Sequence, residues 1–497
     1  NSLLQNITYI GHQSYLFKGT VRDNLLMGKP SASEDELWAV LERVNLAAFL
    51  KSEKGLDTPL LEKASNLSGG QCQRLALARA LLHDSPIYIF DEATSNIDIE
   101  SENNIMAAIH KLAKHKTVLL ISHRLANVIQ SDNIYVLENG RIVAMGHELN
   151  VPADIAVLDA AGLDIFPGFV DAHTHIGLDG YGIGYEGCDY NEMNDIWTPQ
   201  LRAIDGINPR DPSFAHAREA GITCVCTGPG SANVLGGTFT AIKTVGERVD
   251  NMIVKEAVAM KCAFGENPKR CYKDKCDSTR MSTAAFLRGA LASARDYGAR
   301  KAAANGDVTK MPAYNQKLEA LLPVLDHTIP LKAHAHQAND IFTAIRIAKE
   351  FDVGLTLEHV TEGHLIVDEL AKESNIPMAV GPSLTFASKF ELQNKSWETP
   401  GVLAKAGCHV SIITDNSVIP QQYLPLCAGM AVKAGMDPFA ALQAITINPA
   451  KHIGIADRVG SIEVGKDADL VLTDGCPFEV MTNVKAVLIN GAVVSQK

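Results

Sequence analysis

Phe166-Pro167-Gly168-Phe169-Val170-Asp171-Ala172-His173-Thr174-His175 is the stretch that decides the fold of most of this 497-residue chain. It is typical of a short apolar strand that ends in two histidines. Because the two histidines are two positions apart on an extended strand, their imidazoles are expected to point to the same side. A buried metal needs imidazoles and carboxylates that converge from different strands. The stretch therefore predicts a metal site at a strand end.

Further polar residues follow other apolar runs of the chain. His334 follows the run 330–333, His359 ends the run 355–358, and Asp415 ends the run 410–414. A lone histidine is more often structural than a ligand, but several strand ends that carry His or Asp in one domain favour a metal site. Strand–helix alternation from Ile165 onward predicts an α/β fold, a (β/α)8 TIM barrel whose chemistry lies at the C-terminal ends of the strands.

In this order the residues resemble the metal-dependent amidohydrolase superfamily, in particular its imidazolonepropionase-like group. The resemblance runs over residues 147–497 and includes the stretch from Gly460 to Val471 near the end. It implies a barrel at residues 167–454 and a small β-sandwich domain made from residues 134–166 and 455–497.

The resemblance also implies the metal ligands. His173, His175 and Asp415 would hold one divalent metal, and His334 and His359 a second, so we expect one or two Zn²⁺ ions.

Two residues are alternatives for the ligand that would bridge two such metals. Lys261 stands where a carboxylated lysine can sit, and Glu266 stands where other members use a glutamate. We favour Glu266, because it falls at the end of the predicted strand.

The implied reaction is attack of water on an amide-type carbonyl, with metal lowering the pKa of the water. Asp415 would take the proton of this water and pass it to the leaving nitrogen. His336 and His364 are candidate substrate contacts. The rival within the superfamily is a ring deaminase, which carries a glutamate three residues after the histidine of the fifth strand. Gln337 stands there in this chain, and an amide has no titratable proton to donate.

Residues 1–146 predict a second, unrelated α/β segment, because apolar β-branched runs at 87–90 and 117–122 alternate with helical patterns. The segment resembles the nucleotide-binding domain of an ABC exporter, a P-loop NTPase fold. The residues that carry this resemblance are Gln13 (Q-loop), Ser68, Gly69, Gly70 and Gln71 (signature loop), Asp91 and Glu92 (Walker B), Asp98 (D-loop) and His123 (switch).

No G-x-x-x-x-G-K-[ST] phosphate loop, the Walker A motif, occurs in the sequence. We therefore interpret this segment as a partial domain at a gene fusion and expect neither ATP/Mg²⁺ binding nor ATPase activity from it. The rivals to a hydrolase from other classes are an ABC-type transport component and a non-catalytic fusion product.

Residues 134–146 predict a β-hairpin around Glu138-Asn139-Gly140. Both resemblances account for such a hairpin. We expect it to pair with sandwich strands near residues 464–471 and 486–494, because it would then cover an exposed sheet edge. The alternative is a hairpin packed against residues 1–130.

The composition narrows the partners. A net charge of −12 argues against nucleic acid and anionic membranes. Ten cysteines without a C-x-x-C pair favour reduced thiols and hence the cytoplasm. No apolar run is long enough to span a bilayer. We expect a small-molecule substrate and a homo-oligomer.

Overall fold

The protein was analysed as a computed structural model. It describes residues 7–11, 15–91, 115–121, 134–146, 162–180, 184–276 and 279–496, with isolated residues between 105 and 112 and between 149 and 160. The chain divides into two units, Asn1–Val136 with Met145–Gly162, and Leu137–Ala144 with Leu163–Lys497. Each unit is described by itself.

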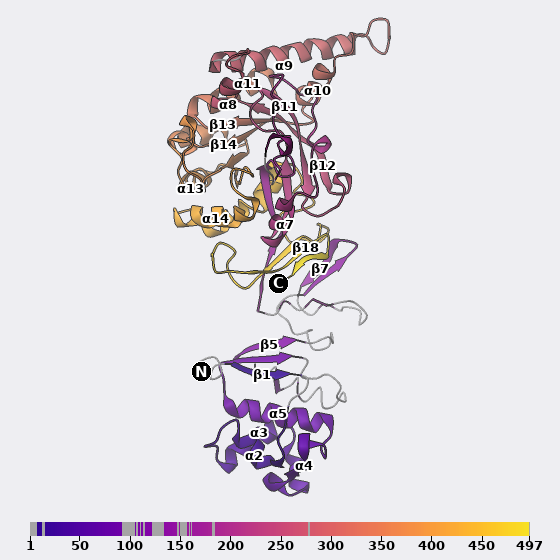
Figure 1. The fold of residues 1–497 in the computed structure, drawn as a ribbon, viewed down its shortest axis with the longest axis vertical. Coiled ribbons are helices and arrows are strands. Elements are labelled where there is room, and N and C mark those ends of the chain that lie inside the picture. The colour runs from indigo at the N-terminus through magenta and orange to yellow at the C-terminus, as the bar shows by residue number, and fades with distance from the viewer. Residues whose placement is uncertain are drawn as a thin grey trace. The chain divides into compact units, whose positions relative to one another are not determined.

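The first unit is a parallel three-stranded sheet with helices on one side of it (Figure 1). Its sheet has the order β1-β4-β5, and a short antiparallel pair, β2 and β3, lies among the helices. Buried leucines of the helices, among them Leu25, Leu41 and Leu75, form its core. The elements are β1 (Ile7–Gly11), β2 (Gly19–Thr20), α2 (Val21–Leu26), α3 (Glu34–Arg43), α4 (Ala47–Ser52), β3 (Pro59–Leu60), α5 (Gly69–His83), β4 (Ile87–Asp91) and β5 (Thr117–Ile121).

An eight-stranded sheet of consecutive order, β9 to β16, forms the nearly closed barrel of the second unit, as expected from the sequence. The strands are β9 (Phe169–Thr174), β10 (Ile222–Thr227), β11 (Leu235–Lys243), β12 (Ile253–Ala263), β13 (Leu331–Ala335), β14 (Leu355–His359), β15 (Met378–Val380) and β16 (Val410–Ile412). The backbone N–H of Asp415, just beyond β16, donates to the carbonyl of His173 on β9 and ties the two ends of the sheet together.

One strand departs from the uniform repeat that the sequence predicts. β11 runs antiparallel to both β10 and β12, and no α-helix stands between these three strands. Residues 235–243 do not show a continuous apolar run, because glycines and threonines alternate with the apolar residues. The remaining pairs of neighbouring barrel strands are parallel.

Helices surround the barrel, and α9 is the longest of the described ones (Figure 1). Strands such as β9, β10, β13 and β14 are buried at every position, because side chains fill the barrel on one face and the helices cover the other. The helices are α7 (Pro212–Glu219), α8 (Glu266–Tyr272), α9 (Arg280–Ala303), α10 (Gln316–Leu325), α11 (Ala338–Phe351), α12 (Val367–Leu370), α13 (Thr399–Lys405), α14 (Leu424–Lys433), α15 (Pro438–Gln443) and α16 (Ile447–His452).

A separate antiparallel sheet of order β19-β18-β17-β8 brings the two ends of this unit together. Its strands are β8 (Asp164–Pro167), β17 (Leu470–Thr473), β18 (Val484–Ile489) and β19 (Ala492–Gln496). It joins the segment before the barrel to the end of the chain.

The predicted hairpin forms as β6 (Ile134–Glu138) and β7 (Arg141–Gly146). Ile142 exchanges backbone hydrogen bonds with residues 465 and 466, and the N–H of Ala468 donates to the carbonyl of Gly140. The pairing expected with residues 464–471 is thus confirmed. The strand expected at 486–494 pairs differently, since β18 bonds to β17 and β19.

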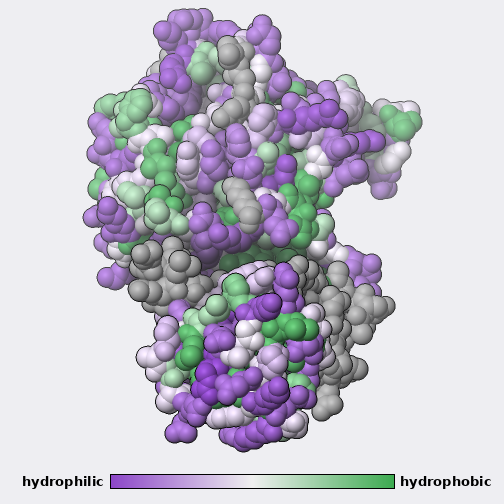
Figure 2. All heavy atoms as spheres, turned by 60° about the horizontal axis from the view of Figure 1, so that its bottom comes forward, coloured by the Kyte–Doolittle hydropathy of each residue, from purple (hydrophilic) through white to green (hydrophobic). Residues whose placement is uncertain are grey.

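The surface seen in Figure 2 is mainly hydrophilic, with small separate hydrophobic patches. Among the described residues, none of the helices has both the length and the apolar character needed to cross a membrane.

Candidate metal centre

The two histidines of β9 lie in the barrel with their ring nitrogens held in one orientation. Nδ1 of His173 donates to the carboxylate of Glu358 at 2.9 Å, and Nδ1 of His175 donates to the carbonyl of Gly228 at 2.7 Å. Because the proton of each ring is on Nδ1, the lone pair is on Nε2. Both Nε2 atoms are therefore in the form that binds a metal.

Asp415 joins these two histidines, as the sequence predicts. Its Oδ1 lies 3.3 Å from Nε2 of His175 and 3.7 Å from Nε2 of His173. A tetrahedral zinc site with bonds of about 2.1 Å places its ligand atoms about 3.4 Å apart. The three side chains therefore have the spacing of ligands around one ion.

His359, the last residue of β14, faces the same space. Its Nδ1 donates to the carbonyl of Gly381 at 2.8 Å, which leaves Nε2 without a partner although the residue is buried. His173, His359 and Asp415 each offer a ligand atom within 4.8 Å of the others.

His334 and His336 come from the end of β13. His334, His336 and His359 form a second group with ligand atoms within 4.8 Å of one another. His334 is 2% exposed, and both of its ring nitrogens lack a hydrogen-bond partner. Buried polar atoms without a partner are costly, so the two nitrogens of this imidazole are consistent with the binding of a cation.

The two candidates for the bridging ligand lie in different surroundings. Lys261 of β12 is fully buried, and its Nζ is 3.2 Å from Nε2 of His173. Glu266 begins α8, and its carboxylate accepts the backbone N–H of Glu391. Lys261 thus lies beside His173, whereas Glu266, the residue that strand position favoured, bonds to the backbone of Glu391. Burial lowers the pKa of Lys261 to about 8.

The two candidate substrate contacts, His336 and His364, lie in different parts of the structure. His336 lies in the histidine group, where its ring stacks on that of His359 with centroids 4.5 Å apart. His364 is only partly buried, and its Nδ1 is 2.9 Å from the hydroxyl of Thr399. Among the contacts of the described residues, none joins His364 to the other candidate site residues.

Two buried carboxylates at the centre do not stand out in the sequence. Glu358 precedes His359 on β14 and reaches His173, and Glu391 lies in the short helix Phe390–Leu392 that follows β15. Glu391 belongs to a loop far from the histidines in sequence, so only its burial among imidazoles identifies it. The pattern of β14, which is buried at every position, offers a signal for Glu358, since a glutamate there needs a partner.

Burial sets the protonation states of the histidines at the candidate centre. Burial lowers the pKa values of His173, His334, His336 and His359 well below the ordinary value, so these imidazoles are neutral, as metal ligands must be. Burial acts to raise the pKa of Asp415, but interactions with the side chains of His359, His175 and Lys261 together outweigh it, so the pKa lies below the usual value.

Asp171 fixes the relative position of β9 and the segment after β16. Its carboxylate accepts the backbone N–H of His173, the N–H and hydroxyl of Thr414, and the side-chain amide of Gln421. These bonds hold both His173 and the residue next to Asp415. Burial raises the pKa of Asp171 to about 6.

Two candidate ligands adopt the left-handed backbone conformation that is uncommon for residues with a side chain. φ is 75° at His359 and 55° at Asp415. Such conformations cost about 1–3 kcal/mol and cluster at functional sites, where the surrounding structure imposes them. Both residues turn the chain at the barrel end where the candidate ligands meet.

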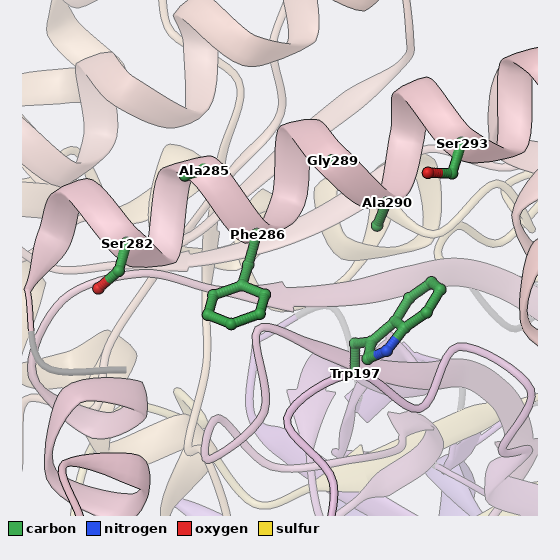
Figure 3. Close-up of a pocket in the computed structure, with 7 residues that line it drawn as sticks. All are labelled: Trp197, Ser282, Ala285, Phe286, Gly289, Ala290 and Ser293. Atoms are coloured by element: carbon green, nitrogen blue, oxygen red, sulfur yellow. The ribbon is translucent and has the colours of Figure 1, made fainter. Parts of the chain in front are cut away.

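A groove of about 500 Å³ lies elsewhere, between α9 and Trp197. Figure 3 shows Phe286 and Ala290 on the side of α9 that faces Trp197. The groove is lined by small and aromatic residues and includes none of the candidate ligands, so it is not part of the metal centre.

Of the ABC motif residues, Ser68, Gly69, Gly70 and Gln71 form the start of α5. Ser68 caps the helix, and its side chain and that of Gln71 bond to each other's backbone N–H. Asp91 ends β4. Gln13, Glu92, Asp98 and His123 lie outside the described residues.

Comparisons with known proteins agree with the two-part organisation. The family model for the amidohydrolase family matches residues 165–494, and the model for ABC transporters matches residues 1–95. The solved structure of an amidohydrolase from Thermotoga maritima MSB8 is 41% identical, with a TM-score of 0.71, and the match covers 73% of this chain and 95% of that one.

Curated relatives match the first part of the chain. An uncharacterized ABC transporter ATP-binding protein of Haemophilus influenzae is 52% identical over 145 residues, which are 29% of this chain and 26% of the relative. A putative multidrug export ATP-binding/permease protein of Staphylococcus aureus is 42% identical over 146 residues, 29% of this chain and 25% of the relative. The chain thus spans about a quarter of the length of these curated relatives. The amidohydrolase match spans most of the sequence, and the chain therefore belongs to the amidohydrolase family, with an ABC transporter segment fused ahead of the barrel.

Proposed function

We propose that the protein is a metal-dependent hydrolase of a carbon–nitrogen bond in an amide, cyclic amide or peptide-like small molecule. The observation that carries the proposal is the convergence of His173, His175 and Asp415 at the spacing of metal ligands. The unpartnered buried nitrogens of His334 and His359 support it, because they fit a bound cation.

The proposed holders of metal are His173, His175 and Asp415 at one position, with His334 and His359 toward a second. A divalent metal supplies a water nucleophile at neutral pH and polarises the carbonyl that is attacked.

Asp415 is the proposed proton carrier. It is ionised at neutral pH, since its pKa lies below the ordinary value, and its side chain is 13% exposed, so it reaches solvent from the barrel. Its carboxylate accepts a proton from the attacking water and returns it to the departing nitrogen, which leaves as a neutral amine.

Lys261 is the proposed bridging ligand, as its carbamate. The ammonium first loses a proton, and the neutral amine then adds carbon dioxide and releases a second proton. A buried cation would thus become an anion with two oxygen donors. A pKa of about 8 raises the fraction of neutral amine relative to an exposed lysine.

The deaminase alternative is less well supported. The side-chain carbonyl of Gln337 accepts a hydrogen bond from Arg280, which also pairs with Asp340 at 2.9 Å. An amide held in this way is not placed to protonate a ring.

The cysteines support a cytoplasmic enzyme, since buried thiols such as Cys224, Cys226 and Cys262 are not joined in disulfides. We propose a homo-oligomer, which size-exclusion chromatography with light scattering tests.

Metal analysis of the purified protein, followed by a hydrolysis screen over dipeptides, N-acyl amino acids and cyclic amides, tests the function. We expect bound zinc or a similar ion and turnover of one of these classes that a chelator abolishes. Protein that is folded but binds no divalent metal, or turnover that the chelator does not affect, would refute the proposal.

A further inference from the structure

A buried glutamate from a distant loop lies against the second histidine group. Glu391 is 1% exposed, and its Oε1 lies 3.6 Å from Nε2 of His334 and 3.7 Å from Nε2 of His336. Both distances exceed those of hydrogen bonds. They are close to the separation of about 3.4 Å between neighbouring ligands of a tetrahedral zinc ion.

The orientation of this carboxylate is fixed from behind. Oε2 of Glu391 accepts the backbone N–H of Glu266 at 2.9 Å, so Oε1 is directed toward the imidazoles. Nδ1 of His336 is likewise held at 2.7 Å by the hydroxyl of Thr361, which leaves its Nε2 toward Glu391. Oε1 of Glu391 and Nε2 of His336 therefore face each other, and Oε1 also accepts a hydrogen bond from Nζ of Lys389 at 3.1 Å.

Lys389 supplies the charge that a buried carboxylate requires. Its Nζ is 3.1 Å from Oε1 of Glu391 and 3.2 Å from Oδ1 of Asn267, and its side chain is 22% exposed. Because the Lys389 side chain is partly exposed, its ammonium group can move into solvent. A cation at the imidazoles can then replace the ammonium as the partner of Glu391.

His334 gives an independent indication of a ligand. It is buried with both ring nitrogens unpartnered, although its neighbours His336 and His359 each have Nδ1 bound. The ring centroid of His334 lies 4.6 Å from that of His336 and 4.3 Å from that of His359, and the three residues offer ligand atoms within 4.8 Å of one another.

We infer that His336 and Glu391 are ligands of a second divalent metal, which they hold together with His334 and His359. This inference rests on the proposed function, because it assigns the second metal of the same centre. It moves His336 from a substrate contact to a ligand and places a carboxylate of the loop after β15 on the metal.

Zinc stoichiometry tests this assignment. Full-length protein is freed of metal with a chelator and titrated with Zn²⁺, and bound zinc is measured by inductively coupled plasma mass spectrometry after gel filtration. We expect two zinc ions per wild-type chain. Glu391→Gln and His336→Asn should each retain one ion, with the affinity for the second lowered at least tenfold.

Glu362→Gln is the matched control. Glu362 is also buried in this region, but its carboxylate accepts the backbone N–H of Ala338 and the amide of Asn394. None of its hydrogen bonds within the described part of the chain goes to an imidazole. This variant should bind two ions. Lys389→Met should bind the second ion at least as tightly as wild type, because the competing cation is gone.

Each result decides the question. Two ions retained in both Glu391→Gln and His336→Asn, or a single ion in wild type that both variants keep, would overturn the inference and leave the proposed function intact. Loss of the second ion in Lys389→Met would also contradict it. A wild-type chain that binds no zinc would refute the proposed function as well. Circular dichroism confirms folding, and the use of two variants keeps the test valid if one of them fails to fold.

Discussion

Glu358 and His173 form a hydrogen bond of 2.9 Å with both side chains fully buried. The same carboxylate pairs with Lys332 at 2.9 Å and accepts from His452 at 2.9 Å and from Thr356 at 2.7 Å. Glu358 thus fixes the tautomer of a candidate metal ligand and balances the charge of a buried lysine. The orientation of His173 and the core of the barrel depend on the same carboxylate.

Glu358→Gln should weaken metal binding and the fold together. Removing a carboxylate that hydrogen-bonds to a metal-binding histidine, without being a ligand itself, typically lowers metal affinity about 10–100-fold. Leaving Lys332 buried without a counter-charge costs about 3–5 kcal/mol of unfolding free energy. Zinc titration and urea denaturation measure the two effects. The double variant Glu358→Gln/Lys332→Met should recover stability but not metal affinity. Recovery of both would show that Glu358 does not position His173.

Asp415→Asn should impair chemistry more than metal retention. Loss of a general acid/base lowers kcat by about 10²–10⁴-fold, while the amide oxygen and the imidazoles still hold metal. His173→Ala, by contrast, should lose metal, because it removes a nitrogen ligand. Bound metal and kcat are compared in the two variants. Near-normal kcat in Asp415→Asn, or full metal and activity in His173→Ala, would show that the centre is assigned wrongly.

Lys261 and Glu266 can be told apart by carbon NMR. Protein equilibrated with ¹³C-bicarbonate should show a carbamate signal that is absent in Lys261→Ala, and this variant should bind less metal because the bridging anion is lost. Glu266→Gln should keep both the signal and the metal content, since its carboxylate contacts the backbone of Glu391. If Glu266→Gln loses metal while Lys261→Ala keeps it, Glu266 is the bridging ligand.

His409 should make the fold less stable in mild acid. Burial lowers the pKa of His409 to about 4, below the value of about 6.5 for an unfolded chain. As pH falls below 6.5, the unfolded state binds a proton that the folded state does not, so the free energy of unfolding falls until pH reaches about 4. Above pH 6.5 the residue is neutral in both states, and its contribution is constant.

Urea denaturation of metal-free protein at pH 7.5 and pH 5 measures this effect. His409→Gln should lose less stability than wild type between the two pH values, because glutamine does not titrate. Equal losses in the two proteins would contradict the assigned pKa shift.

The family and most of the candidate ligands of the centre were predictable from the sequence by itself. His173, His175 and Asp415 are predictable because each follows an apolar strand, and the ends of neighbouring parallel strands meet at one end of a barrel. The hairpin at residues 134–146 was predictable from its alternation and its Asn139-Gly140 turn. β11 was not, since its glycines and threonines conceal a strand that is held by pairing on both sides.

Only the tertiary structure decided which ionisable side chains of different elements lie close together. The position of Glu266 at the end of the predicted strand favoured it as the bridging ligand. In the fold, however, Lys261 lies beside His173 and the Glu266 carboxylate accepts the N–H of Glu391. Glu391 comes from a loop and has no periodic pattern, so its approach to His334 and His336 follows from how the loop packs over the barrel. Strand periodicity reports which face a side chain occupies, because it reflects local geometry. The distance between side chains of different elements depends on packing, which no local pattern encodes.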